Sequence, residues 1–152
     1  MEGRVTLAID ELGPDDLDTW ADCARALFPD EDRAALLDDI RAWSGDGLGR
    51  SRAWVAREGG AVLGYAEMSL RPYANGCDDR PVAFLEAIWV APAARRRGVG
   101  RALVARLAEA ARARGLRELG SDALLANRAA HRAHRGWGFE EAERVVHFRL
   151  GL

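Results

Sequence analysis

One stretch in the second half of the chain most limits how it can fold. Residues 81–91 form an apolar run rich in β-branched and aromatic side chains, which predicts a strand, and residues 99–114 place apolar side chains at helical spacing. Between them lies a turn with three arginines (95–97), then Gly98 and Gly100. The first N–H groups of a helix have no partner within it, and the helix dipole favours negative charge there. The stretch therefore predicts an anion-binding strand–turn–helix unit.

Two nucleotide-binding motifs are excluded at this turn. No Lys-Ser or Lys-Thr pair follows the second glycine, and the third glycine of the dinucleotide-binding motif is absent. What remains is Arg95-x-x-Gly98-x-Gly100 directly after a strand. An ordinary surface turn could carry the same glycine pair, so the interpretation depends on the rest of the chain.

Length and composition predict one soluble domain over residues 1–152. A chain of 152 residues with 49% apolar and 30% charged residues is long enough, and mixed enough, for a single globular core. No run approaches the roughly 18 apolar residues of a membrane span. The first residues lack an apolar signal region, so we expect a cytoplasmic protein. Cys23 and Cys77 lack the spacing of a metal site, so we expect two free thiols and no metal.

Charge is distributed unevenly along the chain. Residues 1–46 carry 13 acidic residues and 4 arginines, whereas residues 47–152 carry 11 acidic residues and 18 arginines. A polyanionic cofactor suits the second part and a cationic co-substrate suits the first, although solvated helix faces would explain most of these acids. The arginine cluster has no interleaved aromatic residues, and the net charge is −2, so we expect no nucleic-acid partner.

Hydrophobic periodicity predicts an α/β domain whose mixed central sheet is flanked by helices. The predicted strands are 4–10, 52–57, 61–70, 82–91, 117–122 and a last strand over 139 and 145–150, and the predicted helices are 14–28, 31–43, 99–114 and 127–137.

Glu86 lies in the middle of the predicted central strand. Strand alternation places it on one face with Val82, Phe84, Ile88 and Val90. A carboxylate on an apolar face is costly unless it has a partner or a task. Glu86 is therefore a candidate catalytic residue, and the alternatives are that an arginine pairs with it or that this face meets solvent.

Two further positions have meaningful spacing. Asp122 ends a short strand, where open α/β sheets line ligand crevices, although a helix cap would also explain an aspartate there. Asn127 is followed by Ala130, His134 and Gly138-Phe139. Taken alone, His134 would be read as a histidine on a helix surface.

The glycine turn and this spacing resemble the GNAT superfamily of acyl-CoA-dependent N-acyltransferases. The turn is similar to the superfamily's pyrophosphate-binding motif, and many members place a tyrosine at the position of His134. That tyrosine protonates the leaving thiolate, and a histidine can do so near neutral pH.

A narrower resemblance covers roughly residues 60–150. The segments Tyr73-Ala-Asn-Gly-Cys-Asp78, Pro81-Val-x-Phe-Leu-Glu86, Ser121-Asp122 and Gly138-Phe139-Glu-Glu are similar to type I aminoglycoside 6′-N-acetyltransferases. The first third of the chain matches only loosely. Phe28 stands where a tryptophan is usual, and His147-Phe148 stands where Phe-Tyr is frequent. The first departure affects the acceptor range; if the missing tyrosine protonates the CoA thiolate in the family, His134 or water must do so here.

The resemblance implies that acetyl-CoA is the co-substrate. It also implies which residues of this chain would form the acetyl-CoA site and the acceptor site. The implied acetyl-CoA site comprises Ile88, Trp89, Val90, Arg95, Arg96, Arg97, Gly98, Val99, Gly100, Arg101 and Asn127. The implied acceptor site comprises Phe28, Tyr73, Asp78, Glu86, Asp122 and Glu143, with Glu86 and His134 as the catalytic residues. The resemblance also implies a homodimer built partly through the C-terminal strand.

We therefore expect direct transfer of an acetyl group from acetyl-CoA to the 6′-amine of an aminoglycoside, within a ternary complex. The central strand should separate from its neighbour near Val90, which would free a backbone N–H to polarise the thioester. Two other functions stay open: N-acetylation of another amine, such as a polyamine or a protein N-terminus, and a non-catalytic acyl-CoA-binding module.

Overall fold

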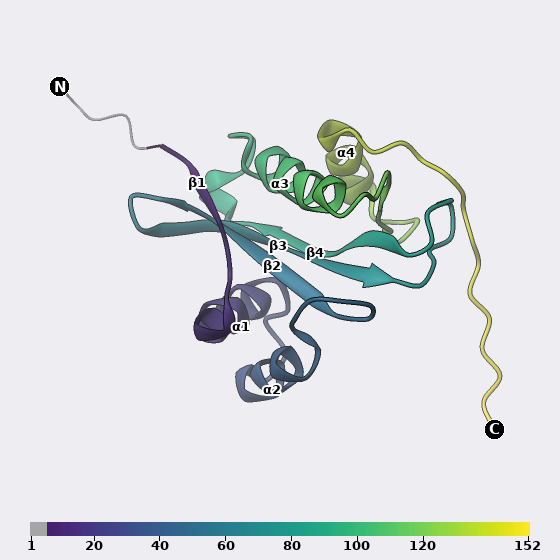
Figure 1. Cartoon of the computed structure of the whole chain (residues 1–152), viewed down its shortest axis with the longest axis horizontal. Coiled ribbons are helices and arrows are strands. Elements are labelled where there is room, and N and C mark those ends of the chain that lie inside the picture. The colour runs from purple at the N-terminus through teal and green to yellow at the C-terminus, as the bar shows by residue number, and fades with distance from the viewer. Residues whose placement is uncertain (1–5) are drawn as a thin grey trace.

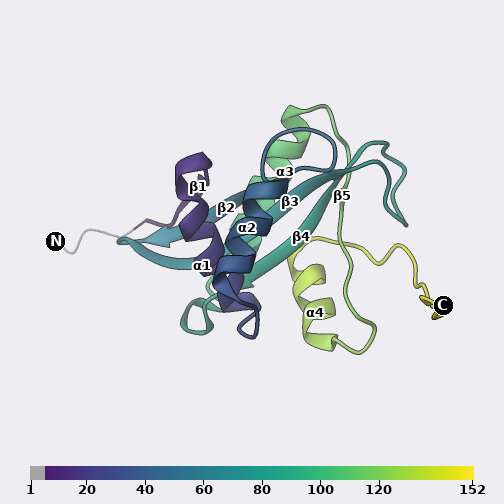
Figure 2. The same ribbon diagram turned by 90° about the horizontal axis from the view of Figure 1, so that it is seen from below.

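The computed structural model describes residues 6–152 and has a five-stranded sheet at its centre (Figures 1 and 2). The sheet order is β1-β2-β3-β4-β5, with antiparallel pairs except for the parallel pair β4 and β5. The strands are β1 (Ala8–Glu11), β2 (Ser51–Glu58), β3 (Ala61–Arg71), β4 (Val82–Val90) and β5 (Leu119–Gly120). The predicted mixed sheet is confirmed. Residues 4 and 5 of the predicted first strand lie outside the described residues.

Helices cover both faces of this sheet. α1 (Leu17–Leu27) and α2 (Arg33–Trp43) lie on one face, and α3 (Val99–Ala113) and α4 (Arg128–Trp137) lie on the other (Figure 1). Short 3₁₀ turns at Pro14–Asp16 and Pro92–Ala94 precede α1 and α3.

Each face of the sheet has its own apolar core. The core under α3 is formed by side chains from the sheet and the helix, including Trp54, Leu85, Leu103 and Leu107. The core under α1 is centred on Trp20, Ile40, Val55 and Tyr65. Burial of these large side chains on both faces removes most of the sheet's apolar surface from water, which is the main term stabilising the fold.

Local capping residues set the helix ends close to the predicted positions. The Asp32 side chain accepts a hydrogen bond from the Ala35 N–H (2.9 Å), so α2 begins at residue 33. In the same way the Asn127 side chain accepts from the Ala130 N–H (3.0 Å) at the start of α4. Gly138, at φ 100°, ends α4 in the left-handed region that glycine adopts without strain.

A β-bulge interrupts the pairing of β3 with β4. Glu67 is opposite Ala87, but Met68 is opposite Leu85, so Glu86 is the additional residue. Beyond the bulge the alternation is reversed, and Ile88 and Val90 pack against the core under α3. The prediction that Glu86 shares a face with Ile88 and Val90 is therefore wrong.

The predicted last strand is also wrong for this chain alone. Residues 139–152 contain no helix or strand and extend away from the body of the molecule (Figure 1). Val146, Phe148 and Leu150 are 76%, 94% and 83% exposed. The alternating pattern that predicted a strand is present, but a strand needs a neighbour for its backbone hydrogen bonds, and this segment leaves the sheet before it can pair.

Candidate active site

The candidate site opens where β4 and β5 separate. Among the described residues, β5 pairs with β4 only at Ala83–Leu119 and Phe84–Gly120. From Leu85 to Val90, β4 keeps β3 on one side and has no strand partner on the β5 side. The expected separation near Val90 is therefore present. Backbone N–H groups that point into this wedge can donate to a carbonyl or to an oxyanion placed there.

The glycine turn joins the open end of the wedge to α3. Gly98 caps α3 at φ 83°, and Arg96 also has a left-handed backbone, at φ 62°. Space is open around Gly98, so its backbone can be approached closely. The first N–H groups of α3 point away from the helix body, because the first intrahelical hydrogen bond runs from Ala102 N to Gly98 O. The turn therefore has the backbone that a pyrophosphate needs.

The arginines of this turn are engaged differently. Arg95 donates to the Val90 carbonyl (3.2 Å), Arg97 pairs with Glu58 (2.8 Å), and Arg101 donates to the Gly136 carbonyl (2.7 Å). These three tie the turn and α3 to their surroundings, whereas Arg96, equally exposed, has no hydrogen bond or ion pair to another of the described residues. Arg96 is thus the arginine best placed to meet an anion directly.

Gly100 and Val99 have packing roles. A Cβ on Gly100 would lie 2.7 Å from Nε1 of Trp137, so this glycine allows α4 to approach α3. The Val99 side chain is buried in the core under α3. Of the two glycines in the motif, only Gly98 is open to a ligand.

Glu86 sits at the bulge, beside the wedge, and is paired. Arg71 donates to both of its oxygens, from Nε to Oε1 and from an NH2 group to Oε2 (2.7 Å each), and the Ser69 hydroxyl donates to Oε1. Hydrogen bonding to Glu86 is the largest cause that raises the pKa of Arg71 above its ordinary value. Of the readings left open by the sequence, two are found together, because Glu86 pairs with an arginine and is also exposed to solvent. Ser69 and Arg71 were missed, although their i, i+2 spacing on a strand puts them on one face.

A second carboxylate, Glu67, lies near Glu86, and the sequence analysis did not identify it. Glu67 is buried on the face toward α1, and the Trp20 indole N–H donates to its Oε1 (2.6 Å). Burial is the largest cause that raises the pKa of Glu67, and the nearby Glu86 carboxylate adds to it.

On the β5 wall of the wedge, His134 is linked to Ser121. Its Nδ1 lies 2.7 Å from the Ala130 carbonyl oxygen, and its Nε2 lies 2.8 Å from the Ser121 hydroxyl. A carbonyl oxygen can only accept, so Nδ1 carries a proton, and the neutral ring accepts the Ser121 proton at Nε2. His134 therefore has a fixed tautomer and faces Ser121. Sequence reasoning did not identify Ser121 as its partner.

The remaining acceptor-site candidates come from four separate segments. Tyr73 and Asp78 are exposed on the loop between β3 and β4. Glu143, in the C-terminal segment, lies next to Gly76 of the same loop. Asp122 follows β5 and is close enough to Arg71 to interact with it electrostatically. Phe28 is exposed at the end of α1. The loop, β5 and the C-terminal segment thus meet near the closed end of the wedge.

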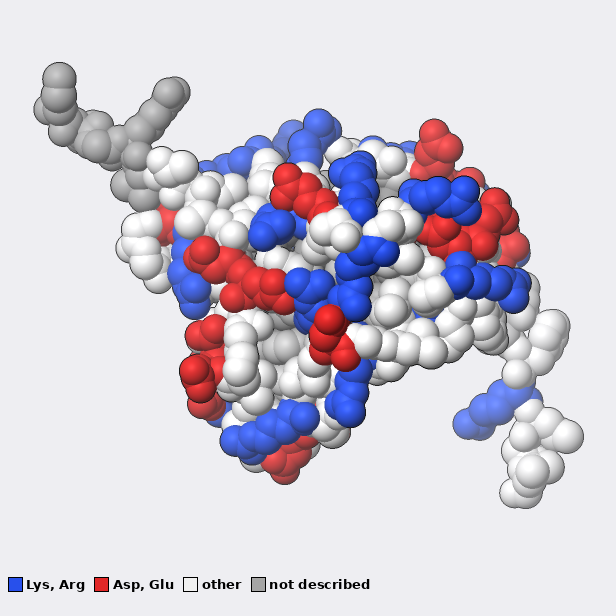
Figure 3. Space-filling view, viewed as in Figure 1, with Lys and Arg blue, Asp and Glu red and all other residues white. Residues whose placement is uncertain are grey.

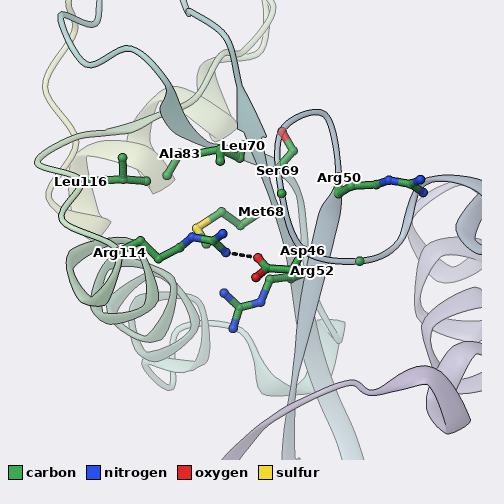
Figure 4. Close-up of a pocket in the computed structure, with 11 residues that line it drawn as sticks. Asp46, Arg50, Arg52, Met68, Ser69, Leu70, Ala83, Arg114 and Leu116 are labelled. Carbon is green, nitrogen blue, oxygen red and sulfur yellow. Dashed lines mark hydrogen bonds and ion pairs between the residues drawn. The ribbon is translucent and has the colours of Figure 1, made fainter.

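Two hollows in the described part of the chain lie elsewhere. One, of about 340 Å³, is lined by α1 and the β2–β3 hairpin and includes Asp22, Cys23 and Arg57. The other is far smaller and lies beside the ion pair of Arg114 and Asp46 (Figure 4). Burial raises the pKa of the Cys23 thiol to about 11, so that thiol stays protonated near neutral pH. Neither hollow includes Glu86, so neither defines the site.

The face seen in Figure 3 carries both charges. Acidic side chains gather at the lower left, near α1 and α2, and again at the upper right, and basic side chains lie between and beside them. Residues 6–152 hold no group of three or more His, Cys, Asp or Glu side chains that could bind a metal ion. In the same range, no helix is long and apolar enough to cross a membrane.

Comparison with known proteins covers most of the chain. The family model described as the acetyltransferase (GNAT) family matches residues 16–139. The chain is 41% identical to an aminoglycoside N(6′)-acetyltransferase type 1 of Stenotrophomonas maltophilia, covering 95% of this chain and 93% of the relative. It is 41% identical to the protein of that name from Serratia marcescens, covering 91% and 94%.

Solved structures give the same result. AAC(6′)-Iy in complex with the bisubstrate analog CoA-S-monomethyl-acetylneamine has a TM-score of 0.87 and 33% identity, covering 97% of this chain and 99% of that one. AAC(6′)-Ih from Acinetobacter baumannii has a TM-score of 0.86 and 31% identity at the same coverage. With its strand–glycine turn–helix unit and its wedge between β4 and β5, the chain belongs to the GNAT family of acetyltransferases.

Proposed function

We propose that this protein transfers the acetyl group of acetyl-CoA to the 6′-amine of aminoglycosides. The observation that carries the proposal is the whole-length similarity to enzymes named for that reaction, in a chain that also has the wedge and the helix N-terminus needed for the donor. Because the relatives are covered almost end to end, the similarity includes the segments that would hold the acceptor as well as those that would hold the donor.

The donor site follows from the backbone of the wedge and turn. The pyrophosphate of acetyl-CoA meets the N–H groups at the start of α3, beside Gly98 and the exposed Arg96. The thioester lies along the open edge of β4 between Ile88 and Val90, where a backbone N–H polarises its carbonyl. Asn127 contributes through its amide nitrogen, because its oxygen already caps α4.

The acceptor site is acidic because aminoglycosides are polycations. Glu86 faces the amine that is acetylated, and Asp122, Glu143 and Asp78 bind other ammonium groups. Tyr73 and Phe28 provide exposed aromatic surface for the sugar rings.

The chemistry is direct aminolysis within a ternary complex. The acceptor ammonium gives a proton, through a bound water, to the Glu86 carboxylate, and the freed lone pair attacks the thioester carbonyl. The nitrogen loses its second proton to solvent through the same water as the amide forms. The tetrahedral oxyanion is held by the N–H of the open β4 edge, and the C–S bond breaks as the carbonyl re-forms. For this step His134 first takes up a proton from solvent at Nε2 and then donates to the Ser121 oxygen; the Ser121 proton passes to the leaving thiolate, the Nε2 proton replaces it, and the ring returns to its neutral form. Both thiols of the chain are left out of this route, since burial raises the pKa of each.

The C-terminal segment supports a homodimer. Residues 146–150 alternate apolar and polar side chains, and the apolar ones are exposed in the single chain. A second copy offers the neighbouring strand that this segment lacks. A reducing cytoplasm is the location that suits two unpaired cysteines.

The experiment is a thiol-release assay with acetyl-CoA and a panel of amines, followed by mass and NMR analysis of the product. The panel contains aminoglycosides with a 6′-amine, a matched aminoglycoside with a 6′-hydroxyl, polyamines and N-terminal peptides. We expect turnover of the 6′-amino compounds alone, with one acetyl group at the 6′ position. Preferred turnover of polyamines or peptides would reassign the acceptor, and binding of acetyl-CoA without transfer to any amine would support a non-catalytic module.

A further inference from the structure

Glu86 has less hydrogen-bonding capacity left than its position suggests. An ionised carboxylate offers about four lone-pair sites, two on each oxygen. The Ser69 hydroxyl and Arg71 Nε use both sites on Oε1, and an Arg71 NH2 group uses one on Oε2. A single acceptor site, on Oε2, is left for an incoming amine or water.

Arg71 is itself held in place by more than this pair. Its guanidinium carbon lies 3.6 Å from the centroid of the Phe84 ring, in a cation–π contact. Ser69 and Arg71 project from the same face of β3, opposite Phe84 and Val82 of β4. The guanidinium is therefore clamped between an aromatic ring and a carboxylate on the neighbouring strand.

The charge of Arg71 calls for an explanation in a site proposed to bind polycations. Two other carboxylates lie near this pair. Asp122 interacts electrostatically with Arg71, and Glu67 interacts electrostatically with Glu86. A positive group here repels a cationic acceptor, so it lowers affinity unless it contributes something else. What it contributes is orientation, because a bidentate fork fixes the plane of a carboxylate as a single hydrogen bond cannot.

We propose that Arg71 is a positioning residue for acetyl transfer, acting through Glu86. It turns the one remaining lone pair of Oε2 toward the wedge, so that the acceptor amine or its bound water meets the carboxylate in one geometry. The bulge supplies the backbone and Arg71 supplies the side-chain alignment. The inference rests on the proposed function of Glu86 in amine acetylation.

The test is a double-mutant cycle measured with the best acceptor of the amine panel. Arg71→Met should lower kcat by about 10- to 100-fold, since a misplaced reacting group costs rate of that order. KM for the acceptor should stay the same or fall, because a repelling charge has been removed. In a Glu86→Gln background, Arg71→Met should change kcat by less than about threefold, because the group on which it acts is already altered. Arg71→Lys, which keeps the charge but not the fork, should fall between wild type and Arg71→Met.

Arg52 provides a matched control. It makes the same bidentate pair with Glu11 (2.6 and 2.9 Å) and lies 5.0 Å from the Trp54 ring centroid, but on the other side of the sheet from Glu86's wedge. Arg52→Met should change thermal stability without changing kcat or KM.

Two results would overturn the inference. One is an Arg71→Met loss that is equally large in the Glu86→Gln background, which would mean that Arg71 acts on a substrate or on the fold. The other is a full recovery of kcat by Arg71→Lys. A wild-type protein that acetylates no amine in the panel would overturn the proposed function itself, which is a different result. If Arg71→Met does not fold, Arg71→Lys is measured in its place. Its loss of kcat should be clear in the wild-type background and nearly absent in the Glu86→Gln background.

Discussion

Asp79 and Glu118 each hold the backbone of the other's segment. Asp79 Oδ2 accepts from the N–H groups of Arg117 (2.6 Å) and Glu118 (2.9 Å), and Glu118 Oε1 accepts from the N–H groups of Asp78 and Asp79 (2.7 Å each). This reciprocal clamp fastens the loop between β3 and β4 to the start of β5. The loop carries two acceptor-site candidates, so the clamp connects acceptor geometry to the fold.

Asp79→Ala should lower the melting temperature by about 5 °C, because it leaves two backbone N–H groups without acceptors. The hydrogen bond from the Arg117 N–H is the largest cause that lowers the pKa of Asp79 below its ordinary value of 3.8. When folding lowers the pKa of a carboxyl, that group stabilises the fold at pH values above its pKa in the unfolded chain. The stabilisation is lost as pH falls through its pKa in the folded protein. Thermal melts from pH 7 to pH 2.5 should therefore show the wild type approaching the variant below pH 3.8. A constant difference in melting temperature across that range would contradict the assignment.

Ser121 and His134 should behave as one unit in catalysis. Ser121→Ala and His134→Gln should each lower kcat by about tenfold or more, and the double variant should be no worse than the more impaired single one. Steady-state kinetics with acetyl-CoA and a 6′-amino aminoglycoside measures this. His131→Gln is the control, since His131 lies on the same helix and its ring is hydrogen-bonded to the Leu124 carbonyl (2.9 Å) and not to Ser121. If the loss of kcat in the double variant equals the product of the two single losses, the two residues act independently, which would contradict this prediction.

Features fixed by neighbouring residues were predictable from the sequence. Asp32 and Asn127 cap helices through side chains three residues before the N–H they bind, and Gly138 ends a helix through its own backbone freedom. The turn before α3 belongs to the same class, because a strand, a glycine and a helix are consecutive. These signals are local, and each was placed within about two residues.

Features that depend on distant pairing were missed. The bulge at Glu86 exists only in the register between β3 and β4, so simple alternation assigned the wrong face to residues beyond it. Arg71 meets Glu86 across that register, and Gly100 meets Trp137 across two helices. The predicted C-terminal strand is wrong for a related reason: its pattern is typical of a strand, but the described residues offer it no neighbouring strand to pair with. Sequence periodicity describes a segment, whereas these errors concern what lies beside it.

Substitutions at the two glycines of the turn should have different effects, one on protein stability and the other on acetyl-CoA binding. Gly100→Ala should lower stability, because its methyl group would lie 2.7 Å from Trp137 Nε1, and the added substitution Trp137→Leu should restore it. Gly98→Ala meets no neighbour but must hold φ 83°, which costs about 1 kcal/mol of strain. It should raise KM for acetyl-CoA and leave KM for the acceptor unchanged. Equal effects of both variants on acetyl-CoA KM would contradict this division.

Removal of residues 145–152 should convert a dimer into a monomer. The segment exposes Val146, Phe148 and Leu150, and a second chain is the partner that would cover them. Light scattering after size-exclusion chromatography measures the mass, with the variant Phe148→Asp as a full-length comparison. Both should be monomeric, and Glu143 stays in place in both. A full-length protein that is monomeric at micromolar concentration would refute the homodimer.

Glu67→Gln should stabilise the protein, and more so as pH rises. Burial raises the pKa of Glu67 above its ordinary value of 4.5, so its contribution to stability is fully present below 4.5 and is lost as pH rises through the folded value. Glutamine keeps an oxygen for the Trp20 N–H but carries no charge to be desolvated. The melting temperatures of wild type and variant should agree within about 1 °C at pH 4.5, and the variant should exceed the wild type by about 3 °C or more at pH 8. Glu109→Gln, an exposed partner of Arg106, should show no such divergence. If the wild-type and Glu67→Gln curves stay parallel from pH 4.5 to pH 8, the buried carboxylate is not the titrating group.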